Sequence, residues 1–197
     1  VVVVTVHHDY YEDALDWDLV ELVPEDLRVE RVGALPTEPF RLVGNIAVRG
    51  FLPLLRRVLK ITDQESIDFL YLPIPPHFAA LLGRIIHAVR DVPYGIDYID
   101  PWVQPPWHPD ERLFNKHWVA RQLARVLEPI AVRHASLITG VAEGYFEGVL
   151  ERNPHLQEKA VTAAMPYGGE PDDHRAVSSL DAEPYLLQND DDTLHFV

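Results

Sequence analysis

The chain contains no cysteine, and basic residues are scarce in it. The lack of cysteine excludes disulfides, thiolate metal ligands and cysteine nucleophiles, and is compatible with a reducing compartment. Lysine and arginine number 17 against 31 aspartates and glutamates, for a net charge of −14. Nucleic-acid-binding proteins need a clustered basic face, so this balance argues against such a partner. No phosphate-binding glycine-rich motif is found either.

Long apolar runs are also missing, since none approaches the roughly 20 residues of a membrane span, and no signal-peptide pattern opens the chain. What is present is an apolar fraction of 47% in 197 residues, enough for one well-buried domain. These features predict a soluble, cytoplasmic protein.

Short β-branched runs alternate with helical patterns along the chain, which is typical of βαβ units. We expect a Rossmann-like α/β fold, in which helices flank an open parallel sheet. The expected strands are Val1–Val6, Arg28–Val32, Ile67–Leu72, Pro93–Ile99, Ser136–Val141 and Lys159–Met165.

Four segments between the strands show helical periodicity. The first is the basic segment Arg41–Ile61, and the clearest is Phe78–Val89. A long helix capped by Asp110 is expected to be kinked or divided at Pro129, and a fourth helix covers Glu143–Arg152. The apolar stripe of the long helix is Val119, Leu123, Val126, Leu127 and Ile130.

The domain is expected to cover residues 1–170, followed by an acidic linker over 171–193. Residues 194–197 begin an apolar run that we interpret as the first strand of another domain. Because Val1 already lies in an expected strand, both ends of the chain look cut. We therefore expect an internal segment of a larger protein.

Two carboxylates, Asp97 and Asp100, stand at the end of the apolar strand that begins at Pro93. The carboxyl ends of the strands form the ligand crevice of an open α/β sheet, so both residues are candidates for a site. For Asp100 the alternative is a carboxylate that caps loop amides around Pro101. For Asp97 it is a buried and paired side chain.

The segment from Arg41 to Ile61 has five cations and no acid. Its Arg49, Arg56, Arg57 and Lys60 are candidates for contact with an anionic membrane surface or a partner. The alternative, which we favour, is an ordinary surface helix with its apolar face on the sheet.

Three stretches of the chain carry a resemblance to a known family. The first begins VVVVTVHHDYYEDALDWDL, the second is DFLYLPIPPHFAALLGRIIHAVRDVPYGIDYIDPW, and the third is LEPIAVRHASLITGVAEGYFEGVLERNP. In the order and spacing of these stretches, the chain resembles the amino-terminal, acceptor-side domain of GT-B glycosyltransferases of the family-four-like group. MPYGGEPDD resembles the exit toward the second domain.

The resemblance implies transfer of a sugar from a nucleotide sugar to a saccharide or lipid-linked acceptor, in bacterial polysaccharide or glycolipid assembly. It also implies that the family's first strand, with its glycine-rich loop, and the carboxyl-terminal donor domain are missing from this chain. This part alone should hold no cofactor and be inactive, whereas the intact protein would bind a nucleotide sugar, on the cytoplasmic side and peripherally at the membrane.

In such a crevice Asp100 and Asp97 would orient an acceptor hydroxyl or accept its proton. Trp102, on a loop with Gln104, Trp107 and His108, would stack on the acceptor or fill the junction of sheet and helix. His77 lies at an expected helix start facing the crevice, with a plain surface histidine as the alternative.

His7 is a further acceptor-binding candidate because it follows the first strand, together with His8 and Asp9. A metal site there is not expected, because adjacent residues of an extended chain point apart. The resemblance agrees, since GT-B enzymes generally use no catalytic metal.

Overall fold

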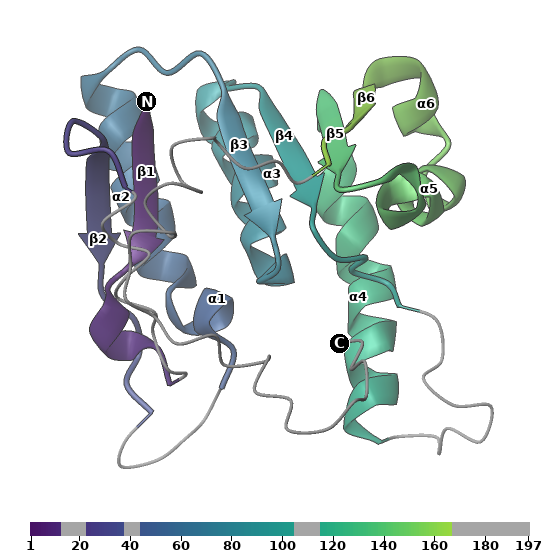
Figure 1. Cartoon of the computed structure of the whole chain (residues 1–197), viewed down its shortest axis with the longest axis horizontal. Coiled ribbons are helices and arrows are strands. Elements are labelled where there is room, and N and C mark those ends of the chain that lie inside the picture. Colours follow the sequence, from purple (N-terminus) through teal and green to yellow (C-terminus); the bar gives the residue numbers. More distant parts are fainter. Residues whose placement is uncertain (13–22, 38–43, 105–114, 167–197) are drawn as a thin grey trace, which may run out of the picture. The chain divides into compact units, whose positions relative to one another are not determined.

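The computed structural model describes residues 1–12, 23–37, 44–104 and 115–166. Val1–Pro166 form one compact unit. This unit is an α/β structure of parallel strands flanked by helices, as the sequence predicts (Figure 1). The predicted acidic linker and the strand at 194–197 lie outside the described residues.

The strands form two parallel sheets instead of the single sheet expected from the sequence. In the smaller sheet, β1 (Val2–Val6) pairs with β2 (Arg28–Val32). The larger sheet has the order β3-β4-β5-β6. Its strands are Leu70–Ile74, Tyr94–Tyr98, Leu137–Gly140 and Val161–Ala164. Among the described residues, β1 and β3 therefore each have one edge that pairs with no strand.

Six helices and two short 3-10 turns connect the strands in the described part of the chain. The helices are α1 (Ile46–Arg49), α2 (Phe51–Gln64), α3 (Ala80–Arg90), α4 (Lys116–Val132), α5 (Glu143–Arg152) and α6 (His155–Lys159). The turns are η1 (His8–Tyr10) and η3 (His77–Ala79). Helices α2, α3 and α4 pack behind the strands, and α5 and α6 lie beside β5 and β6 (Figure 1).

Strand β4 is the centre of the core, because it pairs with β3 on one side and β5 on the other. Its alternate residues Tyr94, Ile96 and Tyr98 are almost fully buried. The Tyr94 hydroxyl donates a hydrogen bond of 2.6 Å to the Ala131 carbonyl of α4. Burial raises the pKa of Tyr94 to about 12, so this phenol stays protonated and ties the strand to the helix.

Strand β3 occupies Leu70–Ile74, so the expected range of Ile67–Leu72 is shifted toward the carboxyl terminus. We expected the proline-rich stretch to end the strand at Leu72, but Pro73 lies within it. Proline is tolerated there because β3 is at an edge of its sheet, where half of the backbone groups need no partner strand.

The face of α4 that packs on the core differs from the predicted apolar stripe. Val119, Leu123, Val126 and Ile130 are 43–62% exposed, with only Leu127 of the stripe half-buried. Periodicity identifies an apolar face of a helix, but it does not say which face packs against the strands. Here the core takes a face with smaller side chains and one acid: Ala124, Glu128, Ala131 and Val132.

The amino end of α4 also differs from prediction. The helix begins at Lys116, where the Asn115 side chain accepts a hydrogen bond of 2.7 Å from the Trp118 amide. Asp110 lies outside the described residues. Pro129 lies within the continuous helix and does not divide it.

The basic segment forms α1 and α2, with Val58 buried in the core and Ile61 also buried. Arg49 cannot belong to a membrane-facing surface, because it is only 3% exposed and donates to the Leu35 carbonyl at 2.7 Å. Arg57 is paired with Glu30.

Arg56 and Lys60 are exposed and stay candidates for surface contact. No helix of the described residues is long and apolar enough to cross a membrane.

Candidate functional site

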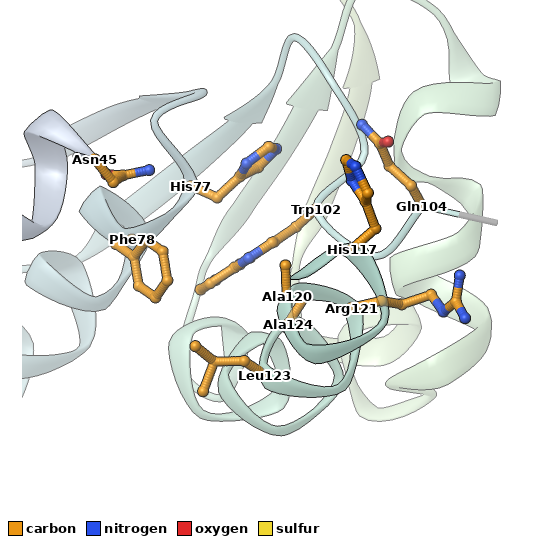
Figure 2. A pocket seen from close by; sticks show the side chains of 10 residues that line it. All are labelled: Asn45, His77, Phe78, Trp102, Gln104, His117, Ala120, Arg121, Leu123 and Ala124. Carbon is orange, nitrogen blue, oxygen red and sulfur yellow. The ribbon is translucent and has the colours of Figure 1, made fainter. Parts of the chain in front are cut away.

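Two adjoining cavities lie at the carboxyl ends of β1, β3 and β4, where an open α/β sheet places its ligands. Their volumes are about 280 and 420 Å³, and Asn45 and His77 line both. The first, drawn in Figure 2, is also lined by Phe78, Trp102, Gln104, His117, Ala120, Arg121, Leu123 and Ala124. The second is also lined by Tyr10, Tyr11, Glu12, Gly44, Ile46, Arg49, Pro75 and Pro76.

The two shared residues are held by local backbone structure. Asn45 caps α1, and its side-chain oxygen accepts hydrogen bonds from the amides of Ala47 at 3.0 Å and Val48 at 3.3 Å. His77 begins η3, two residues after β3 ends, because Pro75 and Pro76 carry no amide hydrogen with which to extend the sheet. Both side chains therefore lie at the start of a helical turn.

Trp102 forms the aromatic wall of the first cavity. Its ring is stacked on His77, with centroids 6.0 Å apart and an interplanar angle of 15°, and meets Phe78 edge-on at 6.0 Å. Trp102 is only 7% exposed. It thus fills the junction of sheet and helix and lines the cavity at the same time, so the two interpretations of this residue are compatible.

His77 contributes a neutral imidazole to the cavity wall. Burial lowers its pKa, and the nearby Asp100 carbonyl, 3.4 Å from Nε2, opposes this only in part. Because histidine normally titrates near 6.5, the ring is uncharged at pH 7. A neutral imidazole has one donor and one acceptor nitrogen, which suits it to a hydroxyl group.

The two candidate carboxylates lie apart from the cavity walls. Asp97 accepts a hydrogen bond of 2.7 Å from the Thr139 hydroxyl, which in turn lies 3.0 Å from the Tyr71 hydroxyl. This matches the paired alternative for Asp97. Asp100 is exposed at the end of β4, and neither cavity is lined by its side chain. Its role stays a prediction.

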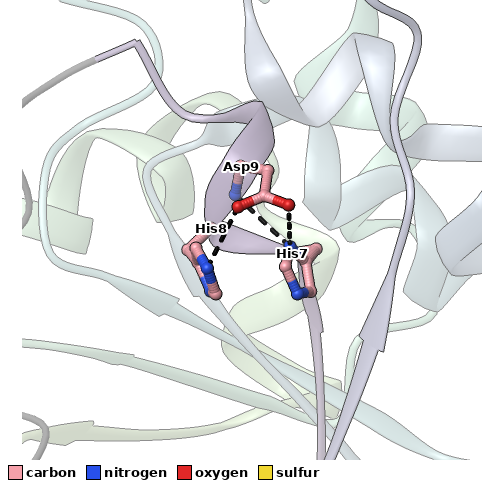
Figure 3. Close-up of side chains that lie close together, drawn as sticks. All are labelled: His7, His8 and Asp9. Carbon is pink, nitrogen blue, oxygen red and sulfur yellow. Dashed lines mark hydrogen bonds and ion pairs between the residues drawn. The ribbon is translucent and has the colours of Figure 1, made fainter.

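His7, His8 and Asp9 converge, contrary to the argument from an extended chain. The backbone leaves β1 at Val6 and turns into η1, so three consecutive side chains gather at one place (Figure 3). One donor atom from each residue lies within 4.8 Å of the others. The geometric reason for excluding a metal was therefore wrong.

Several residues that line the cavities carry little signal in the sequence. Asn45 stands before an apolar helical run, which is a recognisable cap signal. His117 and Arg121 share a helix face at a spacing of four, but nothing in the sequence says that this face meets the loop after β4. Trp107 and His108 lie outside the described residues.

A scan against protein-family models finds no match, and a search of the curated proteins finds none. The assignment of this chain thus depends on its own residues and geometry.

Proposed function

We propose that this chain is the acceptor-binding part of a nucleotide-sugar-dependent glycosyltransferase. The observation that carries the proposal is the pair of adjoining cavities at the carboxyl ends of the strands, where Trp102, His77 and Asn45 combine an aromatic wall with neutral polar groups. Sugars present an apolar ring face and a rim of hydroxyls. An aromatic side chain beside uncharged donors and acceptors matches both.

The arrangement of the strands supports a larger protein. β1 is an edge strand of the smaller sheet and β3 of the larger one, and each has one edge that pairs with no strand among the described residues. In the Rossmann strand order 3-2-1-4-5-6, the first strand lies between the second and the fourth. Strands β2, β1, β3, β4, β5 and β6 follow this order if one strand is supplied from elsewhere. The donor nucleotide sugar would be bound by a further domain.

The proposal is tested with the intact protein, by a screen of nucleotide sugars with release of the nucleotide as the signal. His77→Ala should raise the KM for the acceptor about tenfold or more while the KM for the donor is unchanged, because a hydrogen-bonding side chain that lines both cavities is removed. His87→Ala on α3 is the matched control, since His87 lines neither cavity. Turnover by no nucleotide sugar, or equal effects of the two variants, would count against an acceptor site here.

Asp100→Ala tests the candidate base in the same assay. If the carboxylate accepts the acceptor proton, kcat should fall about 10²-fold or more, with binding of the donor intact. The contact between His77 and Asp100 uses the backbone carbonyl, so it survives this substitution. Unchanged transfer would remove Asp100 from the mechanism and leave the binding proposal standing.

Membrane docking is a second candidate function. The exposed residues of α4 support it more strongly than those of the basic segment. Val119, Leu123, Val126 and Ile130 form an exposed apolar stripe, with Leu123 also lining the first cavity. Arg125 is exposed on this helix, and Glu128, its single acid, is buried. Exposed apolar and cationic side chains on one helix suit an anionic lipid surface.

Arg125→Ala should weaken binding to vesicles that contain phosphatidylglycerol roughly fivefold, because one cation near an anionic surface contributes about 1 kcal/mol. Val126→Glu should weaken it further. Val161→Glu, at an exposed valine of β6, is the control. Co-sedimentation with the vesicles measures binding, and equal binding to phosphatidylcholine alone would contradict the electrostatic part.

A further inference from the structure

Three metal-binding side chains meet directly after β1. His7, His8 and Asp9 are consecutive, and η1 turns the backbone so that their side chains lie together (Figure 3). The two rings are close, with centroids 4.1 Å apart. A donor atom from each side chain lies within 4.8 Å of the other two.

The Asp9 carboxylate lies close to both histidine rings. The Asp9 carboxylate places one oxygen 3.2 Å from His7 Nδ1 and the other 3.0 Å from His8 Nε2. Ligands bound about 2.0–2.1 Å from Zn²⁺ at tetrahedral angles are about 3.3 Å apart. With one Asp9 oxygen as the ligand, one of these separations fits directly. The other donor atoms lie within 4.8 Å of one another, and all three side chains are exposed enough to rotate toward an ion.

The donor types select the class of metal. Two imidazole nitrogens and one carboxylate oxygen match the three-ligand sites of Zn²⁺, whereas Mg²⁺ and Ca²⁺ prefer oxygen alone. The side chains of His7, His8 and Asp9 are 37, 43 and 69% exposed. An ion can therefore enter from solvent, and a water molecule can fill the fourth position.

We propose that His7, His8 and Asp9 bind one divalent transition-metal ion of the Zn²⁺ class at the carboxyl end of β1. The ion lies beside the second cavity, because that cavity is lined by the next three residues of the chain, Tyr10, Tyr11 and Glu12. The open fourth position makes this a site where an oxygen ligand can replace water. The inference goes beyond the proposed function and does not depend on it.

The test is titration of the purified, untagged chain with Zn²⁺ in a calorimeter. One ion per chain should bind. Asp9→Asn and His8→Asn should each weaken binding at least ~10-fold, because mutating even a residue that only hydrogen-bonds to a ligand lowers metal affinity about 10–100-fold. Both substitutions keep the His7 side chain, whose Nδ1 accepts from the Asp9 amide in the metal-free structure. With Co²⁺ in place of Zn²⁺, the unchanged chain should show the strong visible absorption of a tetrahedral Co²⁺ site. Both variants should lack this absorption.

His87→Ala is the matched control. His87 and His134 form the other histidine pair in the described residues, with ring centroids 5.3 Å apart, and this pair is the chief competitor for an added metal. The affinity should be unchanged in this variant. No binding of Zn²⁺, unchanged affinity in Asp9→Asn and His8→Asn, or loss of binding in His87→Ala would each overturn the proposal, whether or not the protein transfers sugar.

Discussion

Arg152→Ala should lower the free energy of unfolding by about 3 kcal/mol, the largest effect of a single substitution that we expect in this domain. Glu128 lies in α4 with its side chain fully buried, and Arg152 at the end of α5 donates to its two oxygens at 2.8 and 3.0 Å. Removing the guanidinium leaves a buried carboxylate without its ionic partner. Because the Arg152 side chain is 35% exposed, water offsets part of the loss.

The measurement is urea unfolding at pH 7, with the midpoint compared at constant slope. Arg125→Ala, at an exposed arginine of α4, is the matched control and should change stability by less than about 0.5 kcal/mol. The double variant Glu128→Met, Arg152→Met should recover most of the stability, because apolar side chains of similar volume often replace a buried ion pair without loss of stability. A loss in the double variant as large as in Arg152→Ala would contradict the explanation.

Gly83→Ala should destabilise the domain by about 2 kcal/mol, although alanine is the better helix former. Gly83 faces the sheet from α3, and a methyl group there would meet Tyr94 Cδ2 at 2.4 Å and Leu72 Cδ1 at 2.6 Å. Tyr94 is fully buried and held by its hydrogen bond to α4, so it cannot move aside cheaply. The glycine lets helix and strands approach closely.

Gly144→Ala in α5 is the matched control, since a methyl group there meets nothing within 4 Å. That variant should be more stable by up to about 1 kcal/mol, from helix propensity alone. The same unfolding experiment compares the two. Stabilisation by both substitutions would show that the contact of α3 with Leu72 and Tyr94 is looser than in the structure.

Local sequence signals predicted the helices and strands whose bounds depend on neighbouring residues alone. β2 and α5 have the predicted bounds, and β1, β4, β5 and β6 differ from their ranges by at most two residues at either end. The errors occur where a distant neighbour decides the outcome. β3 runs through Pro73 because an edge strand tolerates proline, and α4 turns alanines and Glu128 inward because Arg152 supplies the partner for the acid.

The candidate site divides in the same way. Its position at the carboxyl ends of the strands follows from the βαβ pattern, and His77 and Trp102 were found because they follow predicted strands. The prediction of Arg49 as a surface residue was wrong, because the sequence of a basic helix does not indicate that one of its arginines is buried and donates to the Leu35 carbonyl. His117 and Arg121 were missed, since they enter the cavity only when α4 lies beside the loop after β4.

The sequence by itself determined the class of fold and the parallel direction of the strands, because these follow from local periodicity and the handedness of crossovers. It also predicted the edge of the sheet at which a ligand site is expected. Only the tertiary structure decided that the strands form two sheets, that α4 exposes its aliphatic stripe, and that His7, His8 and Asp9 converge. These features depend on the direction of a turn and on contacts between residues distant in sequence, which no local pattern encodes.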